Sequence, residues 1–547
     1  MTSDDAQAGS RDIFAMEVVR HGLASIADEM TAVVMRAARS PALREAGDLS
    51  SALTDAQGGI IAQGNDLPIH LGVMATTVKA LIATVGLAAI QPGDVWILND
   101  VEVGGNHLPD VKIVRPVFVA AELVAFAVSL AHWADVGGGM PGSYHAAATD
   151  LWQEGLRMPP VRLVRADAYV EDVLALVKAN VRGPMEREGD IRAQVAALRF
   201  GEKRLLELVE RVSLAGFRSA IAQLHSLAEK QMRSVVASIP DGTYFGWDRI
   251  DSDYRTGGSP RVAVNVTVRG SDIDFDFTRS DDAIRSPLNT TRFVANSAVL
   301  YVLKAIAGEE IYHADGLARC ITLRTRKGSI VDPPLGLPVA AGNHETSQRI
   351  VDAIVKALAQ AIPERVCAGG CGTAGLLIFS GQRGNGNWWT FYETHGGGEG
   401  AHAHRDGCSA TRVHLSNMAN TPAEFVEREY PLKVLRSAVR AGSGGHGRHA
   451  GGNGIRREYL VLQDKVMLTT VFERGVIAPY GLFGGEDGAP FRVTIRRGGE
   501  TQALDGCANT QLAEGDVVIV ESAGGGGYGS RVAAPSAGAA VVEHGTG

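Results

Sequence analysis

The chain has 547 residues, of which 45% are hydrophobic and 21% charged, and its formal net charge is −8. A chain of this length is expected to form about two to four structural units, and its acidic balance argues against nucleic acid or an anionic membrane as the main partner. Glycine is unusually common, with 66 residues, or about 12%, against a usual ~7%. The glycines occur in clusters, which predict tight turns and close approach of backbone segments.

The N-terminal half is expected to consist of helices and β-hairpins. Residues 1–11 predict a disordered polar start, and apolar residues at helical spacing over 12–39 predict an amphipathic helix. A hairpin is expected at 49–62, where two apolar runs flank Asp-Ala-Gln-Gly-Gly, and a second helix at 69–85. A longer apolar hairpin is expected at 111–131.

The rest of the chain changes from helical to β character. Residues 189–239 predict two or three consecutive helices, and β structure begins near 240. Helices are expected again at 292–307 and 347–362, and glycine-rich β structure from 364 onward. We therefore expect an α+β fold with a helical and hairpin N-terminal half and a glycine-rich β C-terminal half. Its expected parts are a disordered start (1–11), an N-terminal metal-binding domain (12–240), a middle α+β domain (241–363), a glycine-rich β domain (364–530) and a flexible tail (531–547).

Cysteines and apolar stretches indicate the cellular compartment. The five cysteines form no Cys-x-x-Cys pair and are odd in number, so neither a disulfide framework nor a thiolate zinc site is expected. The first residues are polar and acidic, unlike a secretory signal, and the apolar stretch around 117–131 contains Glu122 and is too short to span a membrane. We expect a cytoplasmic protein with no membrane association.

The pattern His-x-x-Asp occurs at both ends of the 111–131 hairpin. One copy is His107-Leu108-Pro109-Asp110 and the other is His132-Trp133-Ala134-Asp135. If the two strands fold about Ala121, antiparallel pairing places Asp110 opposite His132 and His107 opposite Asp135. Imidazole with carboxylate is a ligand set that suits Zn, Mn or Fe. The predicted metal ligands are therefore His107, Asp110, His132 and Asp135.

Two observations leave an alternative open. The same residues are compatible with metal-free His–Asp hydrogen bonds that close the hairpin. Pro116, inside the first strand, indicates an edge strand or a bulge, and a bulge would shift the register by one residue.

Other motifs bear on nucleotide and hydrolase chemistry. No Gly-x-x-x-x-Gly-Lys-Ser/Thr occurs, and the Gly-x-Gly-x-x-Gly at 370–375 leads from a helix into a strand, the reverse of a dinucleotide fingerprint. The His-Gly-Gly-Gly at 395–398 is not accompanied by Gly-x-Ser-x-Gly, so a serine hydrolase is not expected. The histidine pairs at 402/404 and 446/449 are compatible with a second metal site. We expect them instead to be exposed histidines in loops.

Four further residues are candidates for the same site. His70 opens a helix, where backbone N–H groups favour anionic oxygen, so it is either a substrate contact or a cap. Glu45 and Asp48 precede a strand and either join the metal site or cap a turn. Glu154, after the glycine loop that follows the second His-x-x-Asp, is another carboxylate within possible reach of the metal.

An ordered set of short motifs runs over residues 12–530. It comprises Glu45-Ala46-Gly47-Asp48-Leu49-Ser50, Pro68-Ile69-His70-Leu71-Gly72, Gly104-Gly105-Asn106-His107-Leu108-Pro109-Asp110, His132-Trp133-Ala134-Asp135, Glu154-Gly155-Leu156, Ser286-Pro287-Leu288-Asn289 and Gly451-Gly452-Asn453-Gly454. This set resembles the B subunit of ATP-dependent hydantoinases and oxoprolinases. Asn106 replaces the usual threonine, and Trp133 stands where a histidine is common; both changes leave the four candidate ligands intact.

The resemblance implies a metal-dependent subunit of a cyclic-amide hydrolase that opens a hydantoin, oxoproline or lactam ring. In this family, which includes N-methylhydantoinase, 5-oxoprolinase and caprolactamase, a separate A-type subunit uses ATP and Mg to phosphorylate the substrate, and the B-type subunit completes hydrolysis. A hetero-oligomer acting on a small cyclic amide is therefore expected, with Asp135, His70 and Glu154 as catalytic residues. The alternatives are the metal-binding subunit of an ATP-dependent ketone carboxylase of the acetone/acetophenone type, and a metal-free structural subunit.

Overall fold

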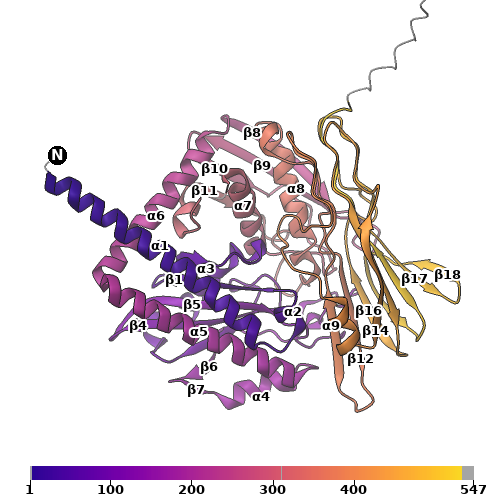
Figure 1. Cartoon of the computed structure of the whole chain (residues 1–547), viewed down its shortest axis with the longest axis horizontal. Coiled ribbons are helices and arrows are strands. Elements are labelled where there is room, and N and C mark those ends of the chain that lie inside the picture. Colours follow the sequence, from indigo (N-terminus) through magenta and orange to yellow (C-terminus); the bar gives the residue numbers. More distant parts are fainter. Residues whose placement is uncertain (1–2, 309–310, 532–547) are drawn as a thin grey trace, which may run out of the picture.

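The computed structural model describes residues 3–308 and 311–531, with side chains from Phe14 onward. Helices and four β-sheets alternate along these residues (Figure 1), which confirms the expected α+β class. Residues 532–547, almost the whole of the expected flexible tail, lie outside the described residues. Helix α1 (Ser3–Ala37) begins earlier than expected, since the polar first residues contain no proline and carry Asp4 and Asp5, which favour a helix N-terminus.

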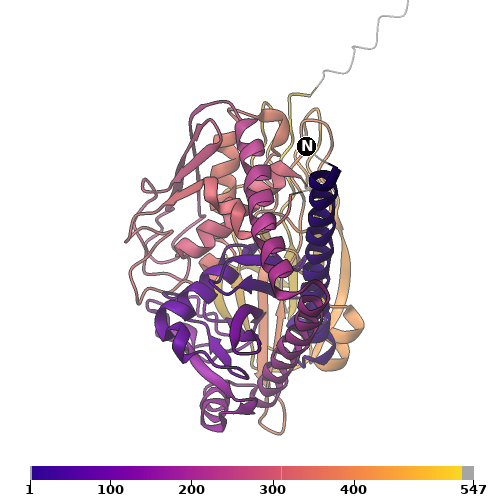
Figure 2. The same cartoon turned by 90° about the vertical axis from the view of Figure 1, so that its left-hand side faces the viewer.

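A seven-stranded antiparallel sheet forms the N-terminal half. Its order is β2 (Ile60–Gln63), β1 (Leu49–Asp55), β5 (Glu122–His132), β4 (Asp110–Val119), β3 (Val95–Leu98), β6 (Val161–Arg165) and β7 (Ala168–Tyr169). Helices α1, α5 (Pro184–Val212) and α6 (Leu214–Ala237) pack together on one face (Figure 2), and α3 (Val73–Val85) packs on the other. Because both faces are covered, the central strands β1, β4 and β5 are buried at nearly every position.

The predicted β4–β5 hairpin forms with the expected register. Asp110 pairs with His132, and the pairing continues unshifted through Pro116 opposite Phe126. The one irregularity lies between Val117 and Phe118, at the turn end of the hairpin. Pro116 is accommodated because the β3–β4 pairing covers only Lys112, Ile113 and Val114, so the proline lies beyond the part of β4 that is paired on both sides.

A four-stranded sheet and two helices form the middle of the chain. The sheet has the order β11 (Ile321–Arg324), β10 (Asp272–Asp276), β9 (Arg261–Arg269) and β8 (Gly242–Arg249). Helix α8 (Thr346–Leu358) packs on β8 and β9, and α7 (Arg292–Ala307) packs on α8. The predicted helix at 292–307 coincides with α7. The short helices elsewhere are α2 (Pro41–Arg44), α4 (Glu171–Ala179), α9 (Ala423–Glu429), η1 (Pro68–His70), η2 (Leu87–Ala89), η3 (Leu151–Glu154), η4 (Asp315–Cys320), η5 (Ala341–Asn343) and η6 (Pro363–Arg365).

Two antiparallel sheets pack face to face in the C-terminal part, at the right of Figure 1. One has the order β13 (Trp388–Glu393), β12 (Leu376–Gln382), β16 (Val466–Val471) and β19 (Cys507–Leu512). The other has the order β14 (Leu432–Arg440), β15 (Gly454–Val461), β20 (Val517–Glu521), β17 (Arg492–Arg497) and β18 (Glu500–Ala503). Their shared core contains Phe379 and Phe391 from the first sheet and Tyr459 and Val518 from the second.

The glycine clusters pack backbone against backbone. We call the segments 368–371, 396–400, 443–452, 480–488 and 523–528 the glycine-packed bundle. Hydrogen bonds such as Gly525 N to Gly452 O (2.9 Å) and Gly452 N to Glu399 O (2.8 Å) connect them outside any named strand. A Cβ atom on Gly525 would lie 1.9 Å from the Glu399 carbonyl oxygen, and one on Gly398 would lie 1.9 Å from that of Gly452. The expected close approach of backbone segments is therefore confirmed here.

One helical stretch among the described residues has the length and apolar character of a membrane span. It is Pro68–Val85, with a mean hydropathy of 1.4 over 18 residues. This stretch comprises η1 and α3, and its residues Val73, Met74, Val78 and Leu81 are buried in the core beside the seven-stranded sheet. The core helix of a folded protein passes the same test.

Candidate metal centre

Two carboxylates and one imidazole, from Asp48, Asp110 and His132, lie in a row at one end of the seven-stranded sheet. Asp110 begins β4 and pairs with His132 at the end of β5, and His132 N donates to the Asp48 carbonyl (3.0 Å), just before β1. Because side chains alternate between faces, Asp48, His132 and Asp110 point to the face that η1 and α3 cover. The strand register therefore sets this row, as the sequence predicted for Asp110 and His132.

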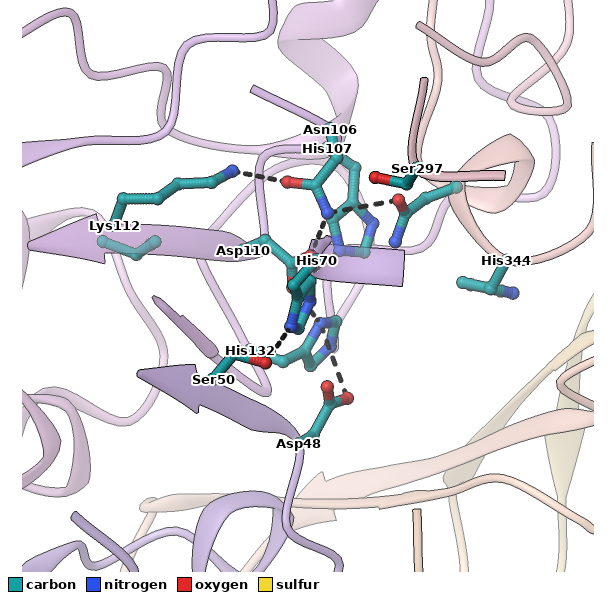
Figure 3. A network of polar contacts seen from close by, with 12 residues as sticks. Asp48, Ser50, His70, Asn106, His107, Asp110, Lys112, His132, Ser297 and His344 are labelled. Carbon is teal, nitrogen blue, oxygen red and sulfur yellow. Dashed lines mark hydrogen bonds and ion pairs between the residues drawn. The ribbon is translucent and has the colours of Figure 1, made fainter. Parts of the chain in front are cut away.

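His107 reaches the row through a turn. Asp110 N donates to the His107 carbonyl (3.3 Å), which folds the His107 side chain back so that its Nε2 lies 2.9 Å from Asp110 Oδ1. His132 Nδ1 lies 3.0 Å from the same oxygen, and His70 Nε2 lies 3.3 Å from Asp110 Oδ2. Figure 3 shows the three imidazoles gathered around this one carboxylate.

The nitrogen atoms of this group leave room for a metal ion. The potential ligand atoms of His107, Asp110 and His132 all lie within 4.8 Å of one another. His107 Nδ1 lies 3.2 Å from the Ala340 carbonyl, which accepts its proton and leaves Nε2 unprotonated. His107 Nε2 and His132 Nε2 are both buried without a hydrogen-bond partner among the described residues. Unpartnered imidazole nitrogens beside an ionised carboxylate fit a divalent cation.

Burial governs the protonation of the site. Burial acts to raise the pKa of Asp110, but its contacts with His107, His132 and His70 outweigh this and hold that pKa well below its usual range. Burial lowers the pKa of His107, which favours the neutral imidazole that a metal ion requires. Burial raises the pKa of Asp48 to about 7, so a nearby cation would favour the ionised form of this carboxylate.

A hydrogen-bonded frame fixes Asp110 from the other side. Asn106 donates from Nδ2 to Asp110 Oδ2 and accepts at Oδ1 from Lys112. Burial lowers the pKa of Lys112 to about 8. Ser50 Oγ lies 2.7 Å from His70 Nδ1, which orients the third imidazole.

His107, Asp110 and His132 line a small cavity of about 30 Å³. Such a volume accommodates about one water molecule or ion. Distant parts of the chain supply its other walls, including His344 at the end of η5 and Tyr392 in β13. Tyr144 OH lies 3.0 Å from His344 Nε2 and 3.4 Å from His107 Nδ1. Nothing in the local sequence around His344 or Tyr392 indicates that they belong to this site.

Asp135 lies outside the ligand group. Its carboxylate accepts from the backbone N–H of Gly137 and Gly142, both at 2.9 Å, and pairs with Arg182 Nη1 at 3.0 Å. The expected facing of His107 and Asp135 does not form, because the chain turns at His107 and leaves the strand after His132. Asp135 instead organises the glycine loop, and we propose no ligand role for it.

Glu154 does not reach the ligand group but binds the backbone segment that contacts His107. Its two oxygens accept from Val339 N (3.0 Å) and Ala340 N (2.9 Å), and the Ala340 carbonyl accepts from His107. Burial raises the pKa of Glu154 to about 8. Glu154 thus positions the backbone that orients His107.

Replacing Glu154 by alanine should weaken metal binding about 10- to 100-fold, since loss of a residue that orients a ligand typically has this effect. A competition titration against a chromophoric chelator measures the affinity. Glu154→Gln keeps one acceptor oxygen and should give a smaller loss. Unchanged affinity in Glu154→Ala would show that the Ala340 carbonyl does not need this support.

The other histidine pairs do not form a comparable group. His402 Nε2 lies 2.9 Å from Glu399 Oε1, in contact with Arg405. Among the side chains that the structure describes (14–308 and 311–531), His107, Asp110 and His132 are the one group of histidine, cysteine and acidic residues close enough together to share a metal ion. The five cysteines are free.

Fold and site together define a large α+β protein that buries a His–Asp–His group able to take a metal ion. The family described as Hydantoinase B/oxoprolinase matches residues 12–531, and the chain belongs to this family. The resemblance found in the motifs is thereby confirmed.

Similar proteins span different lengths. An uncharacterized protein of Methanocaldococcus jannaschii is 34% identical over 95% of this chain and 91% of its own. A caprolactamase beta subunit of Pseudomonas jessenii is 30% identical over 96% of this chain and 92% of its own. The 5-oxoprolinase 1 of Arabidopsis thaliana is 28% identical over 95% of this chain, which spans only 42% of that protein.

Two solved structures share the fold. The ATP-dependent caprolactamase of Pseudomonas jessenii superposes with a TM-score of 0.88 at 29% identity, over 94% of this chain and 91% of the matched chain. An acetone carboxylase gives the same TM-score at 19% identity, over 95% and 76%. The second likeness concerns the fold alone.

Proposed function

We propose that this chain is the B-type subunit of an ATP-dependent cyclic-amide hydrolase and holds a divalent Zn, Mn or Fe ion at His107, Asp110 and His132. The observation that carries the proposal is the pair of unpartnered, buried Nε2 atoms beside the ionised Asp110. When bound, such an ion supplies Lewis-acid catalysis for the addition of water to a carbonyl carbon.

The protein's own groups prepare this chemistry. The Ala340 carbonyl fixes the His107 tautomer, and Ser50 and Asn106 hold His70 and Asp110 in place. His107, Asp110 and His132 are at most 2% exposed, so the cavity excludes bulk water and strengthens electrostatic interactions inside it. His70 and Asp48 remain available at the edge of the group to contact substrate or to add a ligand.

In this proposal another chain activates the substrate. An amide carbonyl is a poor electrophile, and phosphorylation of its oxygen creates a good leaving group. This chain contains no phosphate-binding loop motif, so we assign ATP and Mg to an A-type partner subunit in a hetero-oligomer. The caprolactamase relative carries the name of a beta subunit, which supports a partner, and the caprolactamase structure supports a lactam or similar ring as substrate.

The metal assignment is tested by replacing both histidines. Purified protein should contain about one Zn, Mn or Fe per chain by elemental analysis, and the double variant His107→Ala/His132→Ala should contain almost none, since it removes two of the three proposed ligands, both of them imidazoles. The pair His402→Ala/His404→Ala serves as the matched control and should keep its metal. Metal retained by the first double variant would favour a metal-free structural subunit. Ketone turnover that requires bicarbonate would instead favour a carboxylase.

A further inference from the structure

The walls of the cavity at Asp110 combine carboxylates with apolar side chains. Asp48 and Asp110 contribute the carboxylates, and Leu67, Leu415 and Met418 are among the apolar residues. Within residues 14–308 and 311–531, no lysine or arginine lines this cavity. An anionic substituent on a bound molecule would therefore lie near two carboxylates, and burial strengthens the repulsion between like charges.

Two cationic side chains lie behind these walls and are held by the protein itself. Lys112 donates to Asn106 Oδ1. Arg412 donates from Nε to the Met418 carbonyl (2.8 Å) and from Nη2 to the Thr394 carbonyl (2.7 Å), and its Nη1 is fully enclosed. The charge of Arg412 acts on carboxylates of the protein. Neither cation is therefore available to a molecule in the cavity.

Positive charge inside the cavity is restricted to the proposed metal position. His70 and His344, the histidines of the cavity outside the proposed ligand set, contact protein partners through both ring nitrogens, so neither is free to receive a carboxylate. The charge of the metal proposed above lies at the reacting carbonyl. A carboxylate elsewhere on the ring would have no cationic partner, and burying an unpaired charge is costly.

Asn343, at the end of η5, presents an unused amide donor. Asn106 accepts from Lys112, and its Nδ2 donates both to Asp110 Oδ2 and, at 3.2 Å, to Asn343 Oδ1. Lys112 and Asp110 thus fix the orientation of the Asn106 amide, which in turn fixes that of Asn343. Asn343 Nδ2 donates to none of the described residues and is not among the fully enclosed polar atoms. Because Asn343 lines the cavity, this nitrogen is available to a carbonyl oxygen of a bound ring.

We propose that this cavity takes a cyclic amide without an ionised substituent, and that Asn343 Nδ2 donates to the carbonyl oxygen of the ring. The inference rests on the proposed function and narrows its substrate class. A hydantoin or a simple lactam fits these walls, whereas 5-oxoproline, a lactam that carries a carboxylate, does not.

The segment 415–418 is the part of the wall that yields to the ring. A five-membered ring is larger than the one water molecule that about 30 Å³ accommodates. The segment belongs to no helix or strand, and its backbone hydrogen bonds are long: Ile69 N to Leu415 O measures 3.3 Å, and Ser416 N to Val413 O measures 3.4 Å.

The test compares 5-oxoproline with 5-oxoprolinamide, which has the same ring and nearly the same size but no charge. Calorimetry on the complex with an A-type subunit, without ATP, should show at least about tenfold tighter binding of the amide. With ATP and Mg, kcat/KM should follow the same order. Equal or tighter binding of 5-oxoproline would overturn the proposal.

Two substitutions of Met418 assign the preference to this chain. Met418→Lys adds a cation to the wall and should reduce the preference for the amide at least about tenfold. Met418→Leu changes shape but not charge and should retain the preference. Thermal unfolding and elemental analysis verify the fold and the metal content of both variants. An unchanged preference in Met418→Lys would show that charge in this cavity does not select the ring.

The role of Asn343 is tested by replacing it with alanine. Asn343→Ala should raise the KM for 5-oxoprolinamide about three- to tenfold, the effect of one lost hydrogen bond. Its metal content should not change, because Asp110 and Lys112 still hold Asn106. A purely structural role of Asn343 would instead lower the metal content at unchanged KM, and would overturn the assignment.

The outcomes separate this inference from the proposed function. A complex that opens 5-oxoproline as efficiently as its amide contradicts this inference alone. A complex that opens neither ring, nor a hydantoin or a simple lactam, contradicts the proposed function and this inference with it.

Discussion

Replacing Asp110 by asparagine should lower ring opening by at least about a thousandfold while the subunits still assemble. Asp110 is the carboxylate that contacts His70, His107 and His132. The asparagine side chain lacks the negative charge of Asp110. Because the site is buried, solvent cannot replace that charge. A bound metal contributes several kcal/mol to such reactions, and about 4 kcal/mol corresponds to a thousandfold in rate.

The assay requires the complex with an A-type subunit, ATP, Mg and a cyclic amide, together with elemental analysis of each variant. Asp135→Asn is the matched control, because Asp135 binds the glycine loop and Arg182 instead of the imidazoles. This control should keep its metal, whereas Asp110→Asn should lose most of it. Full activity in Asp110→Asn would refute the assignment of the site.

Replacing Arg474 by methionine should destabilise the fold by about 3–5 kcal/mol, the usual cost of breaking a buried ion pair. Arg474 is fully buried, and its Nη2 lies 2.7 Å from both Asp248 Oδ2 in β8 and Asp352 Oδ2 in α8. It follows β16, so these contacts join the C-terminal sheets to the middle of the chain. Arg497→Met is the control: its ion pair with Asp516 is as short, but the arginine is 56% exposed, so a change within about 1 kcal/mol is expected.

The effect of Arg474→Met should depend on pH. Burial acts to raise the pKa of Asp248 and Asp352, but Arg474 outweighs it and holds both pKa values below their usual range. Stability from a lowered carboxylate pKa is fully present above the pKa of the unfolded chain, about 4, and is lost as the pH falls through the folded value. Denaturant titrations should therefore show the largest loss near pH 7 and a smaller one below about pH 4. An equal loss at both would exclude a charge effect.

The pairing of Asp110 with His132 was predictable because it depends on local chemistry. Alternation within two apolar strands and a short turn at Ala121 fix the register, and the bulge lies at the turn end, beyond Pro116. His107 was found through its spacing from Asp110. These residues are neighbours in one hairpin, so their relative positions can be predicted from the sequence.

The remaining parts of the site depend on long-range packing. His344 and Tyr392 reach the cavity from elements more than 200 residues away from Asp110, and no periodicity connects them with the hairpin. Asp135 was expected opposite His107, but its partner Arg182 lies 47 residues further along the chain. The sequence alone does not determine which of two nearby carboxylates turns toward the imidazoles.

The glycine-packed bundle also affects how the order of this protein would be measured. Its amides, such as those of Gly398, Gly451 and Gly525, are held by backbone hydrogen bonds but belong to no helix or named strand. Circular dichroism counts such residues as coil, whereas slow amide hydrogen exchange reports them as structured. For this chain we therefore expect the two methods to disagree, and the difference between them would measure how much of the C-terminal part is ordered by backbone contact alone.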